Sequence, residues 1–411
     1  MIIVQKFGGS SVADAEKMKK VAGRIFETAA AGNKVVVVVS AMGDTTDHLI
    51  SLANQLIDKP PRREMDMLLS TGEQQSIALL SMALISMGCQ AVSLTGPQAG
   101  FHTDGVFAKA KINSIDCQRV HRELDAGKVV VVAGFQGVDN IGDINTLGRG
   151  GSDTSAVALA VALDADICEV FTDVDGVYTA DPRVVPRAQK MAEVSYDEML
   201  EMAAMGAGIL QPRSVEVAKE YKIKLHVRSS FNHEKGTIVQ EETSMNKGLE
   251  KELMVSGVAH DTNVLKVTIF DVPDRPGVAG SIFSALAKEK INVDMIIQSG
   301  RKNSLQDMSF TTVRDDKSKV LEILDQVVEN IDGAHYSIND QVAKISIIGA
   351  GMITNPGVAA KMFEVLAENN FNIQMISTSE IKVSCIIDEE RIRDAAVLLH
   401  TAFDLDQAAP C

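Results

Sequence analysis

The sequence predicts an α/β domain with a largely parallel sheet covered by helices, followed by two small α+β units that share one design. Three observations lead to this prediction. Short apolar strands alternate with helical patterns up to about residue 230, a polar segment follows, and the C-terminal part repeats itself. A chain of 411 residues also exceeds the size at which one hydrophobic core keeps growing, so we expect at least two domains.

Six short segments rich in Val and Ile are expected to be buried strands: 2–7, 35–39, 91–94, 129–133, 167–171 and 224–227. Helical patterns lie between them at 13–31, 66–87, 115–126, 154–163 and 214–221. This alternation predicts a mostly parallel sheet with helices on both faces. Ligands bind such sheets at the carboxyl ends of the strands, and the glycine-rich segments of this chain fall at those ends.

Composition narrows the class of protein. Hydrophobic residues make up 45% and charged residues 23%, which argues against a disordered chain. A net charge of −15 without any Lys/Arg block argues against nucleic-acid binding, and the longest apolar run, 156–163, is too short to span a membrane. The five cysteines form no CxxC pair or metal-ligand spacing, and no secretory signal is recognisable, so we expect a reducing, cytoplasmic location.

The C-terminal part is predicted to be a duplicated domain. Residues 240–252 are polar and resemble a linker, and beyond them Pro276-Gly277-Val278 recurs 80 positions later as Pro356-Gly357-Val358. The same offset relates four further pairs: Phe283 and Phe363, Leu286 and Leu366, Asn292 and Asn372, Met295 and Met375. Each unit is expected to run strand, turn, helix, strand, strand, helix, which suits one layer of helices on an antiparallel sheet.

The first glycine-rich segment, Lys6-Phe7-Gly8-Gly9-Ser10-Ser11, joins the first strand to a helix. Glycines let the backbone approach a phosphate and Lys6 can neutralise phosphoryl charge, but a tight turn with a serine cap would look the same. Neither a P-loop nor a dinucleotide fingerprint is present: Gly127-Lys128 lacks the upstream glycine and Gly349-Ala350-Gly351 lacks the third glycine.

Two further segments offer groups for a small polar ligand. Ser40 to Asp47 places hydroxyls at a strand's carboxyl end, where they could bind a carboxylate or phosphate or merely cap a helix through Asp44 or Thr45. Gly72 interrupts a helical stretch and indicates that something approaches closely there. The neighbouring Glu73 could then face a cation, although taken alone a solvent-facing glutamate is the more ordinary interpretation.

The last two segments are more specific. Leu147 to Thr154 combines three glycines with Arg149 just before an apolar helix, which favours a carboxylate or phosphate site over a mobile glycine loop. Phe171 to Arg183 follows a buried strand with acids, Tyr and Arg, a mixture suited to nucleotide and Mg²⁺ contacts. Its acidic half also resembles part of a Ca²⁺ loop, but the glutamate expected at the twelfth position is missing.

Taken together, KFGGSS, SAMGDTTD, TGE, GRGGSDTSA and TDVDGVYTADPR, in this order and spacing, resemble the aspartate kinase family of the amino-acid kinase fold. The repeats, with their PGV turns and Ser377-Thr378-Ser379-Glu380, resemble the ferredoxin-like ACT domains of feedback-regulated members. The resemblance implies a kinase domain at 1–239, a linker at 240–261 and ACT domains at 262–337 and 338–411. It covers nearly the whole chain.

The resemblance also implies roles for matching positions. ATP would contact Lys6, Gly8, Gly9, Ser10, Thr172, Asp173, Tyr178, Asp181 and Arg183. The amino acid would contact Ser40, Thr46, Glu73, Arg149, Gly150, Gly151, Ser152 and Asp153, with Lys6, Arg149 and Asp153 as the catalytic residues. An effector would contact Asp274, Pro276, Gly277, Val278, Gln298, Asn355, Gly357, Val358 and Thr378. One departure is Gly208, which lies in the segment 206–210 where many members carry Lys, so a nucleotide contact there is left open.

The implied reaction is ATP plus L-aspartate to 4-phospho-L-aspartate plus ADP with Mg²⁺, the first step of lysine, threonine and methionine biosynthesis. Lysine or threonine would inhibit it, and the ACT units would pair two chains as a dimer. Metal ligands are not identified. Two other hypotheses remain open: a regulatory subunit with a silent kinase half, and a kinase for acetylglutamate, glutamate or uridylate.

Overall fold

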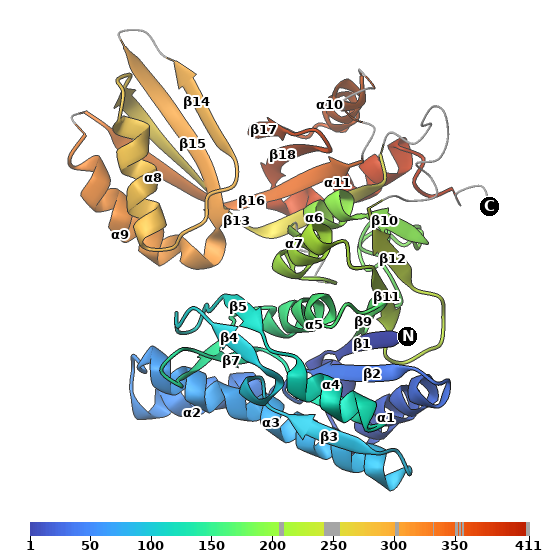
Figure 1. Ribbon diagram of the computed structural model, residues 1–411. Helices are drawn as coiled ribbons and strands as arrows, with labels where there is room; N and C mark the ends of the chain where they lie inside the picture. Colours follow the sequence, from blue (N-terminus) through green and yellow to red (C-terminus); the bar gives the residue numbers. More distant parts are fainter. Residues whose placement is uncertain are drawn as a thin grey trace. The chain divides into compact units, whose positions relative to one another are not determined.

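The structure, a computed structural model, describes residues 1–204, 209–241, 255–300, 304–331, 333–349, 352, 355 and 357–407. It divides into two compact units (Figure 1). The first comprises Met1–Val177 and Lys190–Glu250, and the second comprises Tyr178–Gln189 and Lys251–Cys411. The chain therefore enters the second unit twice, first for residues 178–189, which we call the excursion, and then from residue 251 onward.

The first unit is built on an eight-stranded sheet with the order β10-β12-β11-β9-β1-β2-β6-β3. All neighbouring strands are parallel except β11 and β12. The six predicted strands are present: β1 (Ile2–Phe7), β2 (Lys34–Val39), β3 (Ala91–Leu94), β6 (Val129–Ala133), β9 (Ile167–Thr172) and β11 (Leu225–Ser229). Two short strands, β10 (Glu193–Ser195) and β12 (Thr237–Gln240), extend it at one edge.

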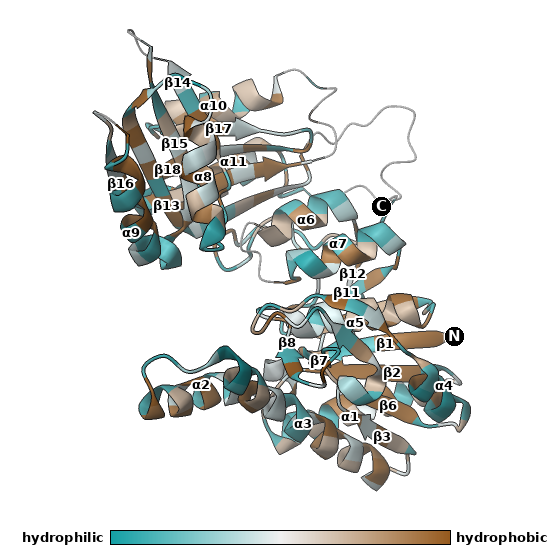
Figure 2. Cartoon of the chain, turned by 60° about the vertical axis from the view of Figure 1, so that its left-hand side comes forward, coloured by the Kyte–Doolittle hydropathy of each residue, from teal (hydrophilic) through white to brown (hydrophobic). Residues whose placement is uncertain are grey.

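Helices cover this sheet because its central strands are apolar on both faces, as their brown colour in Figure 2 shows. Val35, Val37 and Val39 of β2 pack in one core with α1 and α3, while the alternate residues Val36 and Val38 are equally buried on the other face. The helices are α1 (Ala15–Ala30), α2 (Thr45–Leu56), α3 (Arg62–Ser86), α4 (Gln118–Asp125), α5 (Gly151–Ala162), α6 (Tyr196–Ala204) and α7 (Pro212–Tyr221).

The sequence analysis did not find α2, α6 or a small four-stranded sheet. Only Ala53 of α2 is buried, so that helix has no apolar periodicity to reveal it. The small sheet has the order β5-β4-β7-β8 and three of its strands have only three residues. Its strands are β4 (Phe101–Thr103), β5 (Ile112–Ile115), β7 (Gln136–Val138) and β8 (Ile144–Thr146).

The second unit confirms the predicted duplication. A six-stranded antiparallel sheet has the order β14-β15-β13-β16-β18-β17. The first repeat runs β13 (Gly257–Pro273), α8 (Val278–Lys288), β14 (Ile296–Gly300), β15 (Leu305–Val313) and α9 (Lys317–Val328). The second runs β16 (His335–Ile348), α10 (Val358–Glu368), β17 (Met375–Thr378), β18 (Lys382–Asp388) and α11 (Ile392–Ala402). Each repeat has its own apolar core.

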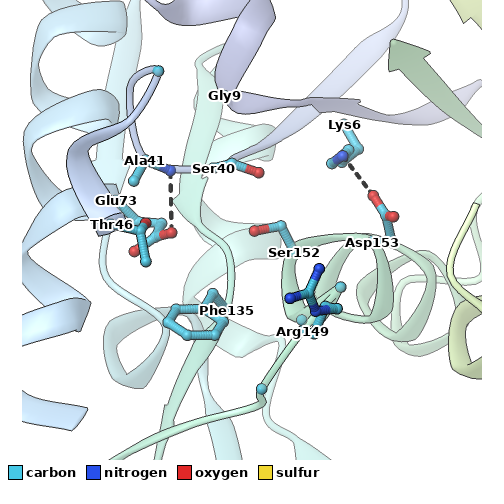
Figure 3. Close-up of a pocket in the computed structure, with 14 residues that line it drawn as sticks. Lys6, Gly9, Ser40, Ala41, Thr46, Glu73, Phe135, Arg149, Ser152 and Asp153 are labelled. Carbon is cyan, nitrogen blue, oxygen red and sulfur yellow. Dashed lines mark hydrogen bonds and ion pairs between the residues drawn. The ribbon is translucent and has the colours of Figure 1, made fainter. Parts of the chain in front are cut away.

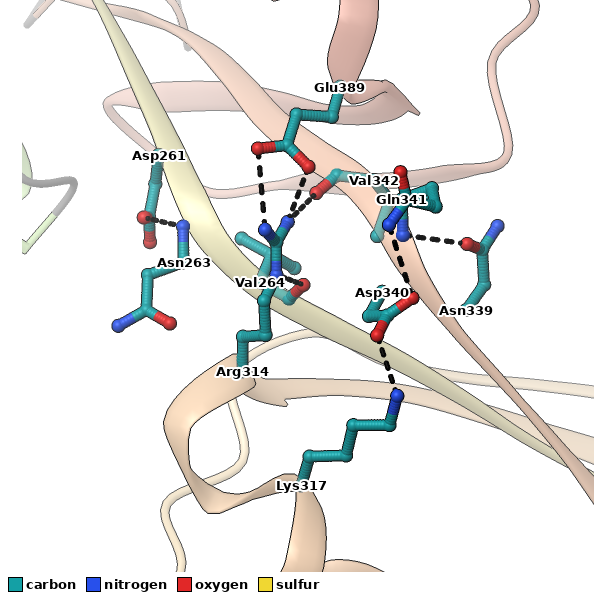
Figure 4. Close-up of polar contacts among 10 residues, drawn as sticks. All are labelled: Asp261, Asn263, Val264, Arg314, Lys317, Asn339, Asp340, Gln341, Val342 and Glu389. Atoms are coloured by element: carbon teal, nitrogen blue, oxygen red, sulfur yellow. Dashed lines mark hydrogen bonds and ion pairs between the residues drawn. The ribbon is translucent and has the colours of Figure 1, made fainter.

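The long strands β13 and β16 are shared between the repeats. The start of β13, residues 257–261, pairs with the end of β16, and the strand register shifts between Asp261 and Val264. At this bend the Asn263 amide donates to Asp261 Oδ1 at 2.8 Å, and at the matching place in β16 the Gln341 amide donates to Asn339 Oδ1 at 2.9 Å (Figure 4). The range 240–261 that was predicted as a linker thus contains the first residues of β13.

Polar side chains connect the two repeats beside this bend. Arg314, which follows β15, forms an ion pair with Glu389 of the second repeat at 2.8 Å (Figure 4). The same guanidinium donates to the carbonyl oxygens of Val264 and Val342, one on each shared strand. Lys317 pairs with Asp340 at 2.6 Å. The repeats are therefore joined by side chains as well as by the sheet.

The excursion 178–189 packs into the core of the second repeat, although the sequence placed it within the range 1–239. Ala180 and Val185 are buried in that core. The Val258 amide donates to the Thr179 carbonyl at 2.7 Å, and Thr179 Oγ1 lies 2.8 Å from His400 Nε2. These contacts fasten a segment that begins shortly after β9 to the second repeat. No helix among the described residues is long and apolar enough to cross a membrane.

Candidate active site

A cavity of about 300 Å³ lies at the carboxyl ends of the central strands of the first unit (Figure 3). Four predicted segments meet there: the turn after β1, the loop after β2, the middle of α3 and the turn between β8 and α5. The lining residues are Lys6, Gly9, Ser40, Ala41, Gly43, Thr46, Glu73, Phe135, Gly148, Arg149, Gly150, Gly151, Ser152 and Asp153. Parallel strands bring these segments together because their carboxyl ends lie at one edge of the sheet.

The glycines of this site permit close packing of its walls. A Cβ on Gly9 would lie 2.7 Å from the Ala41 carbonyl oxygen, and a Cβ on Gly72 would lie 2.9 Å from Ala41 Cβ. Gly72 therefore lets α3 approach the loop after β2, which explains a glycine within a helix. Through this approach Glu73, the next residue along α3, reaches the cavity.

Lys6 and Asp153 form an ion pair at one side of the cavity, as Figure 3 shows. Lys6 Nζ lies 2.5 Å from Asp153 Oδ1, and the two side chains are 12% and 10% exposed. The oxygen has no geometrically aligned hydrogen bond among the described residues, so the contact is a charge pair. Asp153 lies in the first turn of α5, whose N-terminus directs backbone N–H groups toward the same region. The ion pair is neutral overall, and the N-terminus of α5 adds partial positive charge at this side of the cavity.

Glu73 lies on the opposite side of the cavity and is buried, contrary to the ordinary expectation of a solvent-facing residue. It is 3% exposed, and its Oε1 accepts a hydrogen bond from the Ala41 amide at 3.1 Å. Oε2 has no partner among the residues that the structure describes. Burial raises the pKa of Glu73 to about 7 from an ordinary 4.5. A ligand cation would supply the partner that this carboxylate lacks.

Arg149 projects into the cavity from a compact glycine turn. Gly148 and Gly150, on either side of it, adopt the left-handed conformation with φ of 76° and 71°. A Cβ on Gly150 would collide with Gln211, and one on Gly148 would lie 2.9 Å from the Ala108 carbonyl oxygen. The turn is therefore packed against its surroundings. Within the described part of the chain, no residue forms a hydrogen bond or ion pair with the Arg149 guanidinium, which leaves it available for an anion.

Phe135 is a cavity residue that the sequence analysis missed, together with Ala41, Gly43 and Gly148. Its φ is +69°, a left-handed conformation that costs a bulky residue about 1 kcal/mol or more. The Leu147 amide donates to the Phe135 carbonyl at 2.8 Å, and the Phe135 amide donates to Ser155 Oγ at 3.0 Å. The sequence offered one signal for this position, its place two residues after the buried strand 129–133.

The remaining predicted nucleotide residues do not line this cavity. Gly8 and Ser10 flank Gly9 in the turn after β1, and Thr172 ends β9 with its Oγ1 3.0 Å from Asp173 Oδ1. Tyr178, Asp181 and Arg183 belong to the excursion that packs with the second unit. There Arg183 binds Asp181 through two nitrogens, which holds the pKa of that carboxyl below its ordinary value. Gly208 lies outside the described residues.

The predicted effector residues occupy equivalent places in the two repeats. Asp274, Pro276 and Gly277 precede α8 and Val278 begins it, while Asn355 and Gly357 precede α10 and Val358 begins it. Gly277 and Gly357 are both left-handed, with φ of 98° and 106°, so each turn needs its glycine. Gln298 lies on β14 and Thr378 on β17, the two outer strands of the sheet.

Comparison with known proteins assigns both parts of the chain. The amino acid kinase family matches residues 1–229, and ACT domains match residues 266–329 and 345–403. Aspartokinases from Bacillus sp. (strain MGA3) and Geobacillus stearothermophilus are 51% and 52% identical to this chain. Each alignment covers 99% of the chain and 98% of the relative.

Solved structures agree with this assignment. E. coli aspartokinase III in complex with aspartate and ADP superimposes with a TM-score of 0.82 at 25% identity, covering 98% of this chain and 99% of that one. The same protein in complex with lysine and aspartate gives a TM-score of 0.74 at 26% identity, with the same coverage. Aspartate kinase from Synechocystis is 47% identical with a TM-score of 0.55, covering all of this chain and 70% of that one.

Proposed function

Because this chain belongs to the amino acid kinase family and is an aspartokinase, we propose that the cavity described above binds L-aspartate and phosphorylates it from ATP. The observation that carries this proposal is the pairing of two unsatisfied groups in one small cavity. Glu73 Oε2 and the Arg149 guanidinium both lack partners among the described residues. An α-amino acid supplies the complementary ammonium and carboxylate.

The substrate would be held by its invariant groups, which leaves its side chain to react. Arg149 can bind the α-carboxylate through two parallel hydrogen bonds, and Glu73 can bind the α-ammonium. The hydroxyl groups of Ser40, Thr46 and Ser152 line the same cavity and can bind carboxylate oxygens. Both α-carbon groups would thus be fixed, and the β-carboxylate would extend toward Lys6.

The chemistry needs no general base. The β-carboxylate has an ordinary pKa near 4 and is ionised at neutral pH. One of its oxygens attacks the γ-phosphorus of ATP as the bond to the β-phosphate oxygen breaks, giving 4-phospho-L-aspartate and ADP. Lys6 and the N-terminus of α5 would stabilise charge on the transferring group, and Asp153 would hold the Lys6 ammonium in place.

ATP would be used with Mg²⁺. The described residues contain no group of three or more His, Cys, Asp or Glu that could hold a metal. Kinases bind Mg²⁺ mainly through the phosphates of the substrate and through water, and need few protein ligands. Asp153 is the carboxylate at the Lys6 side of the cavity. The ion supplies charge neutralisation at the phosphates.

We further propose that the ACT units bind an inhibitory amino acid, with lysine the first choice and threonine the second. Two findings support this: the matching glycine turns of the two repeats, and a structural neighbour solved with lysine. The outer strands carry exposed apolar residues at repeat-equivalent positions, Ile296 (52% exposed) and Ile376 (42%). These favour a homo-oligomer that pairs through the ACT units.

Free cysteines at Cys89, Cys117, Cys168 and Cys385 agree with a cytoplasmic location.

An ADP-release assay on the full chain tests the activity. We expect release with ATP and L-aspartate, and little with glutamate, acetylglutamate or uridylate. Release with another acceptor alone would reassign the substrate. No release with any acceptor, from protein that still binds lysine, would support the alternative of a regulatory subunit.

A further inference from the structure

The turn that carries Arg149 is held from two sides by charged side chains, one buried and one half-buried, that do not line the cavity. These are Asp66 of α3 and Arg213 of α7. We infer that Asp66 and Arg213 are positioning residues that fix the Arg149 turn, and hence the distance between Arg149 and Glu73, so that the site accepts the α-carboxylate and α-ammonium of one amino acid together. This inference rests on the proposed function of the cavity.

Asp66 is hydrogen-bonded to β8, the strand that leads into the turn. Its side chain is fully buried, and Oδ2 accepts hydrogen bonds from the amides of Thr146 and Ala108, both at 2.9 Å. Oδ1 accepts a third from Thr146 Oγ1 at 2.7 Å. Among the described residues no cation pairs with this carboxylate. A buried carboxylate balanced only by hydrogen-bond donors is costly, and here all the donors come from segments beside the cavity.

Arg213 is hydrogen-bonded to the other side of the same turn. One terminal nitrogen donates to the Leu147 carbonyl at 3.1 Å and the other to the Ala110 carbonyl at 3.0 Å. Leu147 follows Thr146 directly and precedes the glycine turn. The Ala110 amide in turn donates to the Thr146 carbonyl at 3.0 Å. Asp66 and Arg213 therefore hold the backbone immediately before Arg149 from α3 on one side and α7 on the other.

The path of this backbone matters particularly for Arg149. Its guanidinium has no side-chain or carbonyl partner within the described part of the chain, so the path of the turn sets where the charge lies. Asp66 also lies seven residues before Glu73 on α3, two helical turns away and on the same side. A single helix thus carries the acceptor for the ammonium and the anchor for the turn that binds the carboxylate.

Two variants with a matched control test this role. Asp66→Asn keeps the shape but directs an amide N–H at donors, and Arg213→Lys keeps the charge but cannot reach both carbonyls. Arg24→Lys is the control, since Arg24, a buried arginine of the first unit, likewise donates to two carbonyls, those of Ser229 and Asn232, away from the turn. We expect Asp66→Asn and Arg213→Lys to raise the KM for aspartate about tenfold or more, with the KM for ATP changed less than about twofold. The control should leave the KM for aspartate unchanged even if its melting temperature falls.

The decisive readout compares aspartate with its α-amide, which lacks the charged carboxylate. If the two residues act through Arg149, the preference for aspartate over the α-amide shrinks in each variant as it does in Arg149→Ala. Asp66→Asn should also add little in an Arg149→Ala background. A general folding defect would affect both acceptors equally and would leave the preference for aspartate over the α-amide unchanged. An unchanged preference, or additive effects in the double variant, would therefore overturn the inference.

The outcomes separate this inference from the proposed function. If Arg149→Ala itself leaves the preference for aspartate over the α-amide unchanged, the substrate assignment of the cavity is wrong. If Arg149→Ala abolishes the preference while folded Arg213→Lys keeps it, only the positioning role is wrong. Should Asp66→Asn fail to fold, Arg213→Lys decides alone, since it retains the positive charge at a half-buried position.

Discussion

Replacing Glu73 with glutamine should make the free protein more stable at alkaline pH while impairing its use of aspartate. Burial raises the pKa of Glu73 to about 7, whereas the unfolded chain has the ordinary value of 4.5. The folded state therefore holds its proton more tightly than the unfolded state. Its contribution to stability is complete below about pH 4.5 and is lost as the pH rises through about 7.

The size of the effect follows from these two pKa values. The difference between about 7 and 4.5, at about 1.4 kcal/mol for each pKa unit, corresponds to about 3 kcal/mol for Glu73. Glutamine carries no charge at any pH, and its side-chain oxygen can still accept the Ala41 amide hydrogen. We expect Glu73→Gln to unfold with up to about 3 kcal/mol more free energy than wild type at pH 8, and with no advantage below about pH 4.5.

Aspartate reverses the balance, because its ammonium group is expected to favour the ionised carboxylate. In wild type kcat/KM for aspartate should then fall roughly tenfold for each pH unit below about 7, while Glu73→Gln should be low and insensitive to pH over that range. Chemical denaturation and steady-state kinetics between pH 5 and 8.5 measure both effects. A stability difference that does not vary with pH, or normal aspartate use by the variant, would refute the reasoning.

Glu169 provides a matched control of opposite sign. Burial alone would raise the pKa of this carboxyl, but the nearby His226 ring, 3.6 Å away, and hydrogen bonds from Gln5 and Arg228 lower it to about 2. Its contribution to stability is present above about pH 4.5 and is lost as the pH falls toward 2. Glu169→Gln should therefore destabilise the protein most at neutral pH, where Glu73→Gln approaches its largest gain.

Three further predictions concern other parts of the chain. Lys6→Ala should lower kcat roughly 100- to 1000-fold, since it removes a preorganised positive charge, and steady-state kinetics that show only a raised KM for aspartate would contradict this role. Gly72→Ala should cost about 1–3 kcal/mol in urea denaturation because its methyl group would overlap Ala41, whereas Gly23→Ala in α1, with only one side-chain atom at 3.8 Å, should be neutral or stabilising. Thr378→Ala should leave uninhibited kcat nearly intact and raise the lysine or threonine concentration needed for half-inhibition, and a wild type indifferent to both amino acids at millimolar concentration would reject the sensing role.

The elements that the sequence predicted share a local signal. Strands such as β2 and β6 are nearly uninterrupted runs of valine, and the two repeats are recognisable from matching residues at one offset. Where the local signal was weak the prediction failed. The helix α2 buries a single alanine, and the strands of the small sheet are too short to show a period. Such elements form through contacts with segments that are distant in the sequence.

The amino-acid sequence by itself determined the fold class, the duplication and the segments that meet at the cavity, because each depends on hydrophobic period or on glycine and charge at fixed spacing. Only the tertiary structure decided the state of individual groups. Glu73 accepts a hydrogen bond from Ala41, thirty-two residues away, and Asp66 accepts hydrogen bonds from Ala108 and from Thr146, eighty residues away. Desolvation and hydrogen bonding act through space, so the same glutamate or aspartate is an ordinary surface residue in one packing and a buried, functional charge in another.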